Sequence, residues 1–204
     1  MIVIVDYGMG NLGSILNMLK KIGTPAQISS QSDDIRRADK LILPGVGAFD
    51  NAMDNLYKYG LFKVLNEQVK EKGIPILGIC LGIQLFTKRS EEGIKSGLGW
   101  LDAETVKFRF NQNTSLKTPH MGWNELDIKN DEGILHDLPE YSRFYFVHSY
   151  HLKGIKEENV IASSQYGYEF TAAVHQDNIW GTQFHPEKSH KFGLKLLKNF
   201  VEMV

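Results

Sequence analysis

The first half of the chain alternates between short apolar runs and segments with helical periodicity, and this alternation constrains the fold most. Residues 2–5 form a continuous apolar run, typical of a strand buried on both faces, and residues 74–79 predict a second buried strand. The spacing of apolar residues predicts helices at 11–21, 48–56, 61–71 and 83–87, and strands at 26–30 and 41–43. Strands that alternate with helices predict an α/β fold with a doubly wound, mostly parallel sheet.

The second half of the chain changes character, because strand-like segments follow one another with only short polar loops between them. These segments are 106–110, 125–129, 144–150, 160–163, 172–176 and 179–184. Their succession predicts antiparallel additions to the sheet in the C-terminal half. A last helix is predicted from about Ser189 to Met203. Because no repeat, low-complexity tract or linker interrupts the pattern, we expect one domain over residues 1–204.

The balance of charge argues against several classes of partner. The 204 residues carry a formal net charge of −1 without a run of like charge, so we predict neither a nucleic-acid partner nor a membrane surface. The apolar stretch at the start ends at Asp6, too early for a signal peptide, and no run reaches membrane-spanning length. The single cysteine forbids an internal disulfide and fits a reducing compartment. We therefore expect a cytoplasmic protein.

That cysteine, Cys80, lies between two glycines in the segment GICLG at 78–82. The order matches a G-x-C-x-G form of the nucleophile elbow, a sharp turn from a strand into a helix. Side chains at 78 and 82 would collide as the turn closes, and the N-terminus of the following helix favours the reactive thiolate. A lone cysteine is more often a buried structural residue. Here the strand, the glycines and the helix together favour a nucleophile.

A thiol nucleophile needs a proton acceptor, usually a histidine that a third group orients. His185 follows the predicted strand 179–184, and Glu187 comes two residues later. Cys80 also follows a strand, and catalytic groups in open α/β sheets gather beyond the carboxyl ends of strands. The plainer interpretation is a surface histidine beside a helix-capping glutamate. The pairing with the Cys80 turn favours a catalytic triad of Cys80, His185 and Glu187.

Two other patterns imitate binding sites. Residues 8–13 read G-x-G-x-x-G, but the next predicted strand, 26–30, lacks the acidic residue that a dinucleotide site requires. His148 and His151 are three residues apart, which places them on opposite faces of one continuous strand, and no C-x-x-C accompanies them. We predict neither a nucleotide site nor a metal site.

The motifs together resemble those of a known family. Along its whole length the chain resembles the class I, triad-type glutamine amidotransferases. The segment 78–84 is similar to the nucleophile motif of the family, which Gln84 extends to G-x-C-x-G-x-Q, and 184–187 is similar to its distal motif. Four further segments narrow the resemblance to the glutaminase subunits of imidazole glycerol phosphate synthases, which belong to histidine biosynthesis: 6–11, 44–47, 119–124 and 146–150.

The resemblance implies roles around a glutamine substrate, with no cofactor. Cys80 attacks the side-chain amide, His185 protonates the departing ammonia and then activates water, and Glu187 orients His185. Two backbone N–H groups, those of Gly47 and Leu81, hold the oxyanion. The residues expected to bind the two ends of glutamine are Gln84, Glu92, Ser149 and Tyr150.

The resemblance also implies a partner, because free ammonia becomes protonated and diffuses away at neutral pH. The expected partner is a (βα)8-barrel cyclase subunit that forms a heterodimer with this chain, receives the ammonia and gates the oxyanion hole through the segment 44–47. The glutaminase is then expected to be poorly active alone. The residues expected at the interface are Asn11, His120, Met121, Trp123 and Asn124.

Three alternatives stay open. His151 and the segment 189–191 depart from the histidine-pathway pattern, which favours a paralogue that supplies another synthase, for example one that amidates surface sugars. A catalytically silent binding module is a second alternative, and the complete triad argues against it. A cysteine peptidase or deglycase is a third, and Gln84 and the H-P-E order argue against that.

Overall fold

Ten strands form the main sheet in the computed structural model, which describes residues 1–111 and 115–204. Five of them run parallel to one another: β2 (Ala26–Ser29), β1 (Ile2–Val5), β3 (Lys40–Gly45), β4 (Ile76–Cys80) and β12 (Ile179–Thr182). The sheet continues with antiparallel strands: β11 (Tyr168–Gln176), β10 (Val160–Tyr166) and β7 (Asp127–Ile128), with β9 (Tyr150–Lys153) on β11 and β5 (Glu104–Lys107) on β9. The predicted fold class is confirmed.

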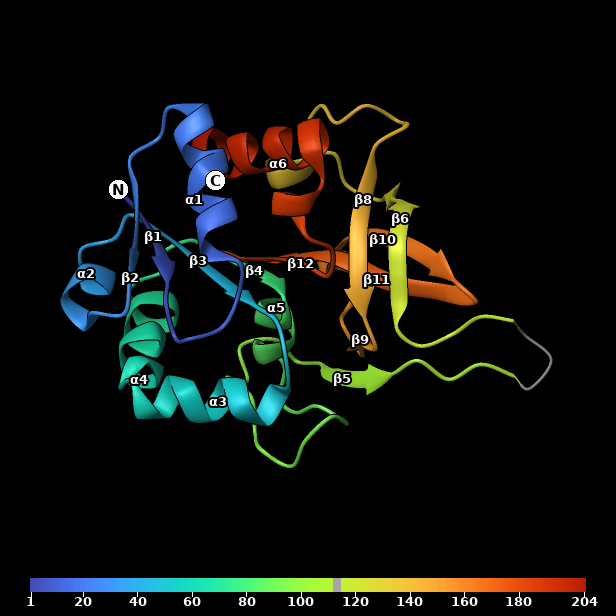
Figure 1. Cartoon of the computed structure of the whole chain (residues 1–204), viewed down its shortest axis with the longest axis horizontal. Coiled ribbons are helices and arrows are strands. Elements are labelled where there is room, and N and C mark those ends of the chain that lie inside the picture. The colour runs from blue at the N-terminus through green and yellow to red at the C-terminus, as the bar shows by residue number, and fades with distance from the viewer. Residues whose placement is uncertain (112–114) are drawn as a thin grey trace.

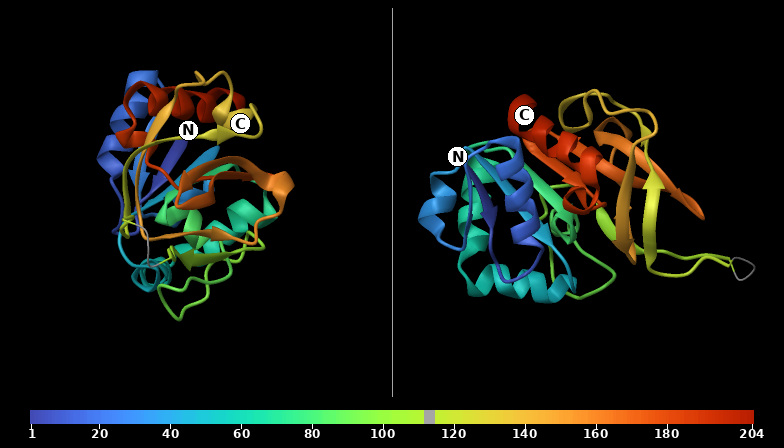
Figure 2. Two further views of the ribbon diagram at one scale, coloured as in Figure 1. Left: turned by 90° about the vertical axis from the view of Figure 1, so that its right-hand side faces the viewer. Right: turned by 45° about the horizontal axis from the view of Figure 1, so that its top comes forward.

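Helices cover both faces of the parallel half of the sheet (Figures 1 and 2). One face carries α1 (Leu12–Ile22) and α6 (His190–Met203), which contact each other. The other face carries α2 (Ser32–Arg36), α3 (Phe49–Lys58), α4 (Leu61–Asn66) and α5 (Leu81–Leu85), and α4 continues as a π-helical turn at Glu67–Glu71. Short 3-10 turns lie at Gly133–Leu135, Glu157–Asn159 and Pro186–Lys188. This is the double winding that the alternation of elements predicted.

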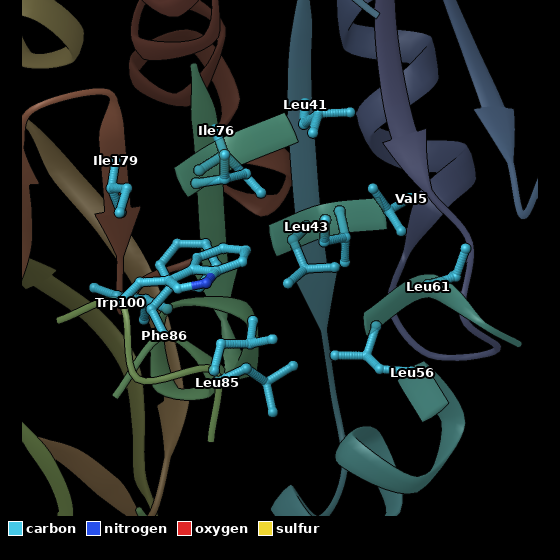
Figure 3. Packing of buried hydrophobic residues seen from close by; sticks show 14 of the residues in the cluster. Val5, Leu41, Leu43, Leu56, Leu61, Ile76, Leu85, Phe86, Trp100 and Ile179 are labelled. Carbon is cyan, nitrogen blue, oxygen red and sulfur yellow. The ribbon is translucent and has the colours of Figure 1, made fainter. Parts of the chain in front are cut away.

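The core consists of two apolar clusters, one on each face of the sheet. Because successive side chains of a strand point to opposite faces, Val5 packs in one cluster and its neighbour Ile4 in the other. Figure 3 shows part of the first cluster, in which Leu41 and Leu43 from β3 lie between Val5 from β1 and Ile76 from β4. Full burial of each such side chain stabilises the fold by about 1.5–3 kcal/mol. The two clusters hold β3 and β4 rigidly in the middle of the sheet, and the ends of these strands carry the candidate site.

A separate two-stranded sheet crosses the antiparallel half of the molecule (Figure 1). It pairs β6 (His120–Glu125) with β8 (Arg143–His148) in antiparallel register. A bridge connects it to the main body, since the His185 backbone N–H donates to the Tyr145 carbonyl oxygen at 2.9 Å. This bridge holds the end of β8 beside the segment that follows β12.

Several predicted boundaries differ from the structure. The strand predicted at 144–150 breaks at Ser149, whose carbonyl oxygen accepts from the Phe108 N–H at 3.0 Å while the chain passes from β8 to β9. The predicted strand 125–129 is divided between the end of β6 and β7, and the predicted strand 106–110 is displaced to β5. Neither α2 nor β6 was predicted. Helix α2 spans five residues, which are too few to show a helical period of apolar side chains. Strand β6 exposes the apolar Met121 and buries the polar His120, whereas a half-buried strand usually buries its apolar side chains.

Candidate active site

Cys80 is the last residue of β4 and adopts φ 54° and ψ −107°, a strained backbone conformation for a residue with a side chain. The two flanking glycines are required by packing. A Cβ at Gly82 would lie 1.8 Å from the Leu43 carbonyl oxygen, and one at Gly78 would lie 2.5 Å from the Phe86 ring. The turn therefore presents the Cys80 side chain at the carboxyl end of β4, as a nucleophile elbow does.

His185 follows β12, the strand next to β4, and its imidazole meets the Glu187 carboxylate. His185 Nδ1 and Glu187 Oε1 are 2.7 Å apart, and each side chain is only 2 % exposed. A carboxylate accepts, so Nδ1 carries a hydrogen and Nε2 is left for the substrate side. Among the described residues Nε2 has no hydrogen-bond partner, so this ring nitrogen is free to meet a substrate.

The protonation state of His185 follows from its surroundings. Burial by itself opposes the charged imidazole, but the charge and hydrogen bonding of Cys80, followed by those of Glu187, outweigh burial and raise the pKa of His185 to about 10. The His185 ring therefore stays charged at neutral pH. It also holds the proton that a leaving amine needs.

A cavity of about 500 Å³ opens in front of these groups. Eight residues that the sequence singled out line it: Gly47, Cys80, Leu81, Gln84, Glu92, Ser149, Tyr150 and His185. Glu187 does not line the cavity, because it lies behind the imidazole. Segments that are far apart in sequence thus converge on one volume of a size suited to a small molecule.

The two predicted oxyanion donors follow the carboxyl ends of two neighbouring parallel strands, Gly47 after β3 and Leu81 after β4. Leu81 is the first residue of α5, so its N–H has no intrahelical acceptor and is available to a ligand. Gly47 has φ 105°, and a Cβ there would lie 2.8 Å from Met9 Cε. The buried Tyr7 hydroxyl donates to the Pro44 carbonyl oxygen at 2.8 Å, which fixes the end of β3 just before this glycine.

Gln84 and Glu92 are oriented by the protein. The Gln84 amide nitrogen donates to the Tyr150 carbonyl oxygen and to Gln183 Oε1, each at 3.1 Å, so the amide oxygen remains as its acceptor for a ligand. One carboxylate oxygen of Glu92 accepts from the Phe49 N–H at 2.9 Å. Burial raises the pKa of Glu92, although the Phe49 N–H opposes this. Both acceptors suit the ammonium group of an amino acid.

Comparison with known proteins places this arrangement in a family. The family model described as "Glutamine amidotransferase class-I" matches residues 3–204. This chain belongs to the class-I glutamine amidotransferase family. The family that the sequence motifs predicted is confirmed.

Two relatives match this amidotransferase over nearly their whole length. A protein of Pseudomonas aeruginosa named imidazole glycerol phosphate synthase subunit HisH 2 is 53 % identical over 204 residues, which cover 100 % of both chains. A protein of Methanococcus maripaludis with the same name is 52 % identical and covers 99 % of each chain. These names agree with the subfamily that the sequence resembles.

A solved structure supports the fold. A glutamine amidotransferase of Thermotoga maritima superimposes with a TM-score of 0.69 at 18 % identity, covering 98 % of this chain and 96 % of that one. No helix in the described part of the chain has the length and apolar character that crossing a bilayer requires.

Two residues of the amidotransferase site were missed by the sequence reasoning. Gln183 is fully buried, and its amide nitrogen lies 3.9 Å from Cys80 Sγ. His148 lines the cavity, and its Nδ1 lies 2.7 Å from the Tyr150 carbonyl oxygen. Gln183 directly precedes the motif at 184–187, so adjacency was the available signal. The assumption of one strand through His148 and His151 was wrong, because the break at Ser149 lets both rings pack on Phe108.

The predicted interface residues of the amidotransferase fall into two groups. Met121 and Trp123 project from β6 and are 61 % and 47 % exposed, and Asn11 is exposed where α1 begins. His120 is buried behind them, and Asn124 donates to the Gln165 carbonyl oxygen at 2.8 Å. Strand β6 therefore presents an apolar outer side and a polar inner side.

Proposed function

We propose that this chain is the glutaminase subunit of an imidazole glycerol phosphate synthase, which hydrolyses glutamine and passes the ammonia to a cyclase subunit. The observation that carries the proposal is that Cys80 and His185 line one cavity, with the Glu187 carboxylate behind the imidazole. Gln84 and Glu92 line the same cavity. A nucleophile, an oriented imidazole and acceptors for an ammonium group are the parts that hydrolysis of an amino-acid amide requires.

The first half of the reaction forms a thioester. The Cys80 thiolate attacks the carboxamide carbon, and the negative charge that develops on oxygen is held by the N–H groups of Leu81 and Gly47. The His185 imidazolium gives its Nε2 proton to the amide nitrogen, the carbon–nitrogen bond breaks, and ammonia leaves. Loss of one oxyanion donor typically lowers kcat by about 10²–10³-fold.

The second half releases glutamate. His185, now neutral, takes a proton from water, and the hydroxide adds to the thioester carbon. The carbon–sulfur bond then breaks, which returns the thiolate and the imidazolium, and the product carboxyl group loses its proton to solvent. Glu187 keeps the hydrogen of His185 on Nδ1 throughout, so that Nε2 faces the reacting atoms in both halves.

Glutamine is held at its α-carbon end by Gln84, Glu92, Ser149 and Tyr150. The free amide oxygen of Gln84 and the Glu92 carboxylate accept from the α-ammonium group. Ser149 and Tyr150 lie at the bend between β8 and β9 and contact the α-carboxylate. This arrangement places the side-chain amide toward Cys80 at the other end of the cavity.

The ammonia acceptor lies on a partner with a (βα)8-barrel fold, so the working enzyme is a heterodimer. The contact is made by Met121 and Trp123 with Asn11 and Asn124, while His120 supports β6 from inside. Exposed Trp and Met residues are the types enriched at protein interfaces. Delivery within a complex keeps ammonia unprotonated until it reacts, and the pathway is cytoplasmic.

A second candidate function is supply of ammonia to a synthase outside histidine biosynthesis. The relatives from Pseudomonas aeruginosa and Methanococcus maripaludis both carry the number 2 in their names, which distinguishes one protein of that name from another. A second copy of a glutaminase can keep its own chemistry while its product serves a different acceptor. The identity of the partner separates the two candidates.

Reconstitution tests the proposal. The purified chain is mixed with the cyclase subunit from the same organism, and product formation is followed with either glutamine or ammonium as the nitrogen source. We expect turnover with both sources for the native chain, and with ammonium alone for Cys80→Ala. A native complex that uses ammonium but never glutamine contradicts the proposal. Failure to bind this cyclase, together with binding to another synthase, replaces the first candidate with the second.

A further inference from the structure

A row of hydrogen-bonded polar groups connects β6 to the nucleophile through the interior of the protein. Its members, which we call the relay, are Asn124, His120, His148, the Tyr150 carbonyl group, Gln84 and Gln183. Asn124 is half-buried, and the other four side chains are each at most 5 % exposed. Polar groups this deep are costly unless they are all paired, so a continuous row of them calls for a physical reason.

The direction of each hydrogen bond in the first half of the relay can be deduced. His148 Nδ1 lies 2.7 Å from the Tyr150 carbonyl oxygen, which can only accept, so Nδ1 carries the hydrogen. His148 Nε2 therefore accepts from His120 Nδ1 at 3.0 Å. His120 Nε2 accepts in turn from the Asn124 amide at 3.3 Å. Burial lowers the pKa of His120 to about 4 and that of His148 to about 3, so both rings are neutral, as this order requires.

The second half of the relay runs from Tyr150 to the sulfur. The Tyr150 carbonyl oxygen also accepts from the Gln84 amide nitrogen at 3.1 Å, so it joins both halves. The same Gln84 nitrogen donates to Gln183 Oε1 at 3.1 Å. The Gln183 amide nitrogen then points at Cys80 Sγ at 3.9 Å. Gln84 therefore uses its two amide hydrogens to join the Tyr150 carbonyl group to Gln183.

Packing prevents the His120 ring from turning away. The ring stacks on Tyr166 with centroids 4.1 Å apart, and on Phe146 with centroids 4.8 Å apart. In the pairing of β6 with β8, His120 is also directly opposite His148. A displacement of β6 therefore moves His120 as a rigid group, and the change is passed to the His148 ring.

We propose that His120, His148 and Gln183 are positioning residues that couple the outer face of β6 to the Cys80 thiolate. This inference rests on the proposed function, in which a partner binds Met121 and Trp123 on that face. Binding that shifts β6 changes the hydrogen bonds at the Tyr150 carbonyl group, and through Gln84 and Gln183 it changes the donor that faces the sulfur. The relay approaches the cavity from β6. The segment 44–47, which carries the predicted oxyanion donor Gly47, approaches it from the end of β3.

Three variants in complex with saturating cyclase subunit test the relay. His120→Phe keeps an aromatic ring but removes both nitrogens, while His120→Asn keeps an N–H at the position of Nδ1. Asn199→Leu is the matched control, because Asn199 is equally buried and donates to Ile134 and His136 away from the site. Glutaminase kcat and KM, thermal stability and cyclase affinity are measured for each.

We expect His120→Phe to lower the cyclase-stimulated kcat about tenfold while KM for glutamine changes less than twofold. His120→Asn should recover most of this loss, and Asn199→Leu should lower the melting temperature without lowering kcat. A stimulated kcat for His120→Phe equal to that of the native chain overturns the relay. So does an equal fall for Asn199→Leu, because that result indicates general destabilisation. A native complex with no glutaminase activity refutes the proposed function instead.

A measurement on the native chain avoids any effect of substitution on folding. Nitrogen-15 NMR of the imidazoles should show hydrogen on Nδ1 of both His120 and His148, and titration with the cyclase subunit should shift both ring signals. A hydrogen on Nε2 of His148 contradicts the deduced order of the bonds. Ring signals that stay unchanged at saturation contradict the coupling.

Discussion

The Glu187 carboxylate lies 2.7 Å from Nδ1 of His185, and both side chains are almost fully withdrawn from solvent. This contact fixes which ring nitrogen carries the hydrogen and which one faces the thiol. It arises from two residues separated only by Pro186, at the point where the chain leaves β12 and enters a 3-10 turn. The orientation of the proposed catalytic base, His185, is therefore set within one short segment.

Substitution of Glu187 by glutamine tests the orienting role. The side chain keeps its shape, but the amide can donate to Nδ1 and so favours the tautomer with hydrogen on Nε2. We expect kcat to fall by about 10³–10⁴-fold with little change in stability, as in other triads with this defect. Glutamine hydrolysis in the assembled complex and thermal denaturation check both parts. A loss of less than threefold would show that Glu187 does not act on His185.

The charge on His185 depends on Cys80. The pKa of His185 is raised above the ordinary value of about 6.5, so its protonation stabilises the fold fully below that pH. This contribution is lost as the pH rises through about 10. In Cys80→Ala the largest interaction that raises the pKa of His185 disappears and burial still opposes the charge, so this pKa must fall. Nitrogen-15 titration of the ring in both proteins measures the shift, and an unchanged midpoint would contradict the pairing of sulfur and imidazole.

Gly82, two residues after Cys80, is expected to be needed for the stability of the fold as well as for catalysis. Gly82→Ala places a Cβ 1.8 Å from the Leu43 carbonyl oxygen, and backbone must move to relieve the clash. We expect a loss of about 4 kcal/mol or more in the free energy of unfolding. Gly13→Ala, on α1, meets no atom within 4 Å and should be neutral or stabilise by about 0.5–1 kcal/mol. Denaturant titration compares the two, and equal stabilities would refute the packing argument.

Trp123 is expected to be an anchor for the partner. Truncation of a central aromatic anchor typically costs about 2 kcal/mol or more of binding free energy, so Trp123→Ala should weaken cyclase binding by about thirtyfold. Its ring is 47 % exposed and stacks on His190, so the free energy of unfolding should change by less than about 1 kcal/mol. Ile94→Ala, at a side chain that is 97 % exposed on another surface, is the control. Calorimetric titration that finds equal affinities for both variants rejects β6 as the contact.

The sequence predicted those parts of the candidate site whose residues are neighbours along the chain. The Cys80 turn and the His185–Glu187 segment were found because each is a short motif with a physical requirement at every position. The position of His148 was not predictable, because the apolar pattern runs through Ser149 without a break and the bend comes from pairing with distant strands. Gln183 gave no signal, because a buried glutamine is recognised only by its partners. Those partners belong to other elements of the fold.

Covalent labelling of the chain shows whether Cys80 is the nucleophile and whether His185 activates it. The protein is incubated with a glutamine analogue that carries an electrophilic carbon in place of the amide, with and without excess glutamine, and the modified residue is located by mass spectrometry. We predict a single adduct on Cys80, suppressed by glutamine and formed much more slowly in His185→Ala. Inactivation by the analogue without modification of Cys80, or labelling of Cys80 at the same rate in His185→Ala, would contradict the triad.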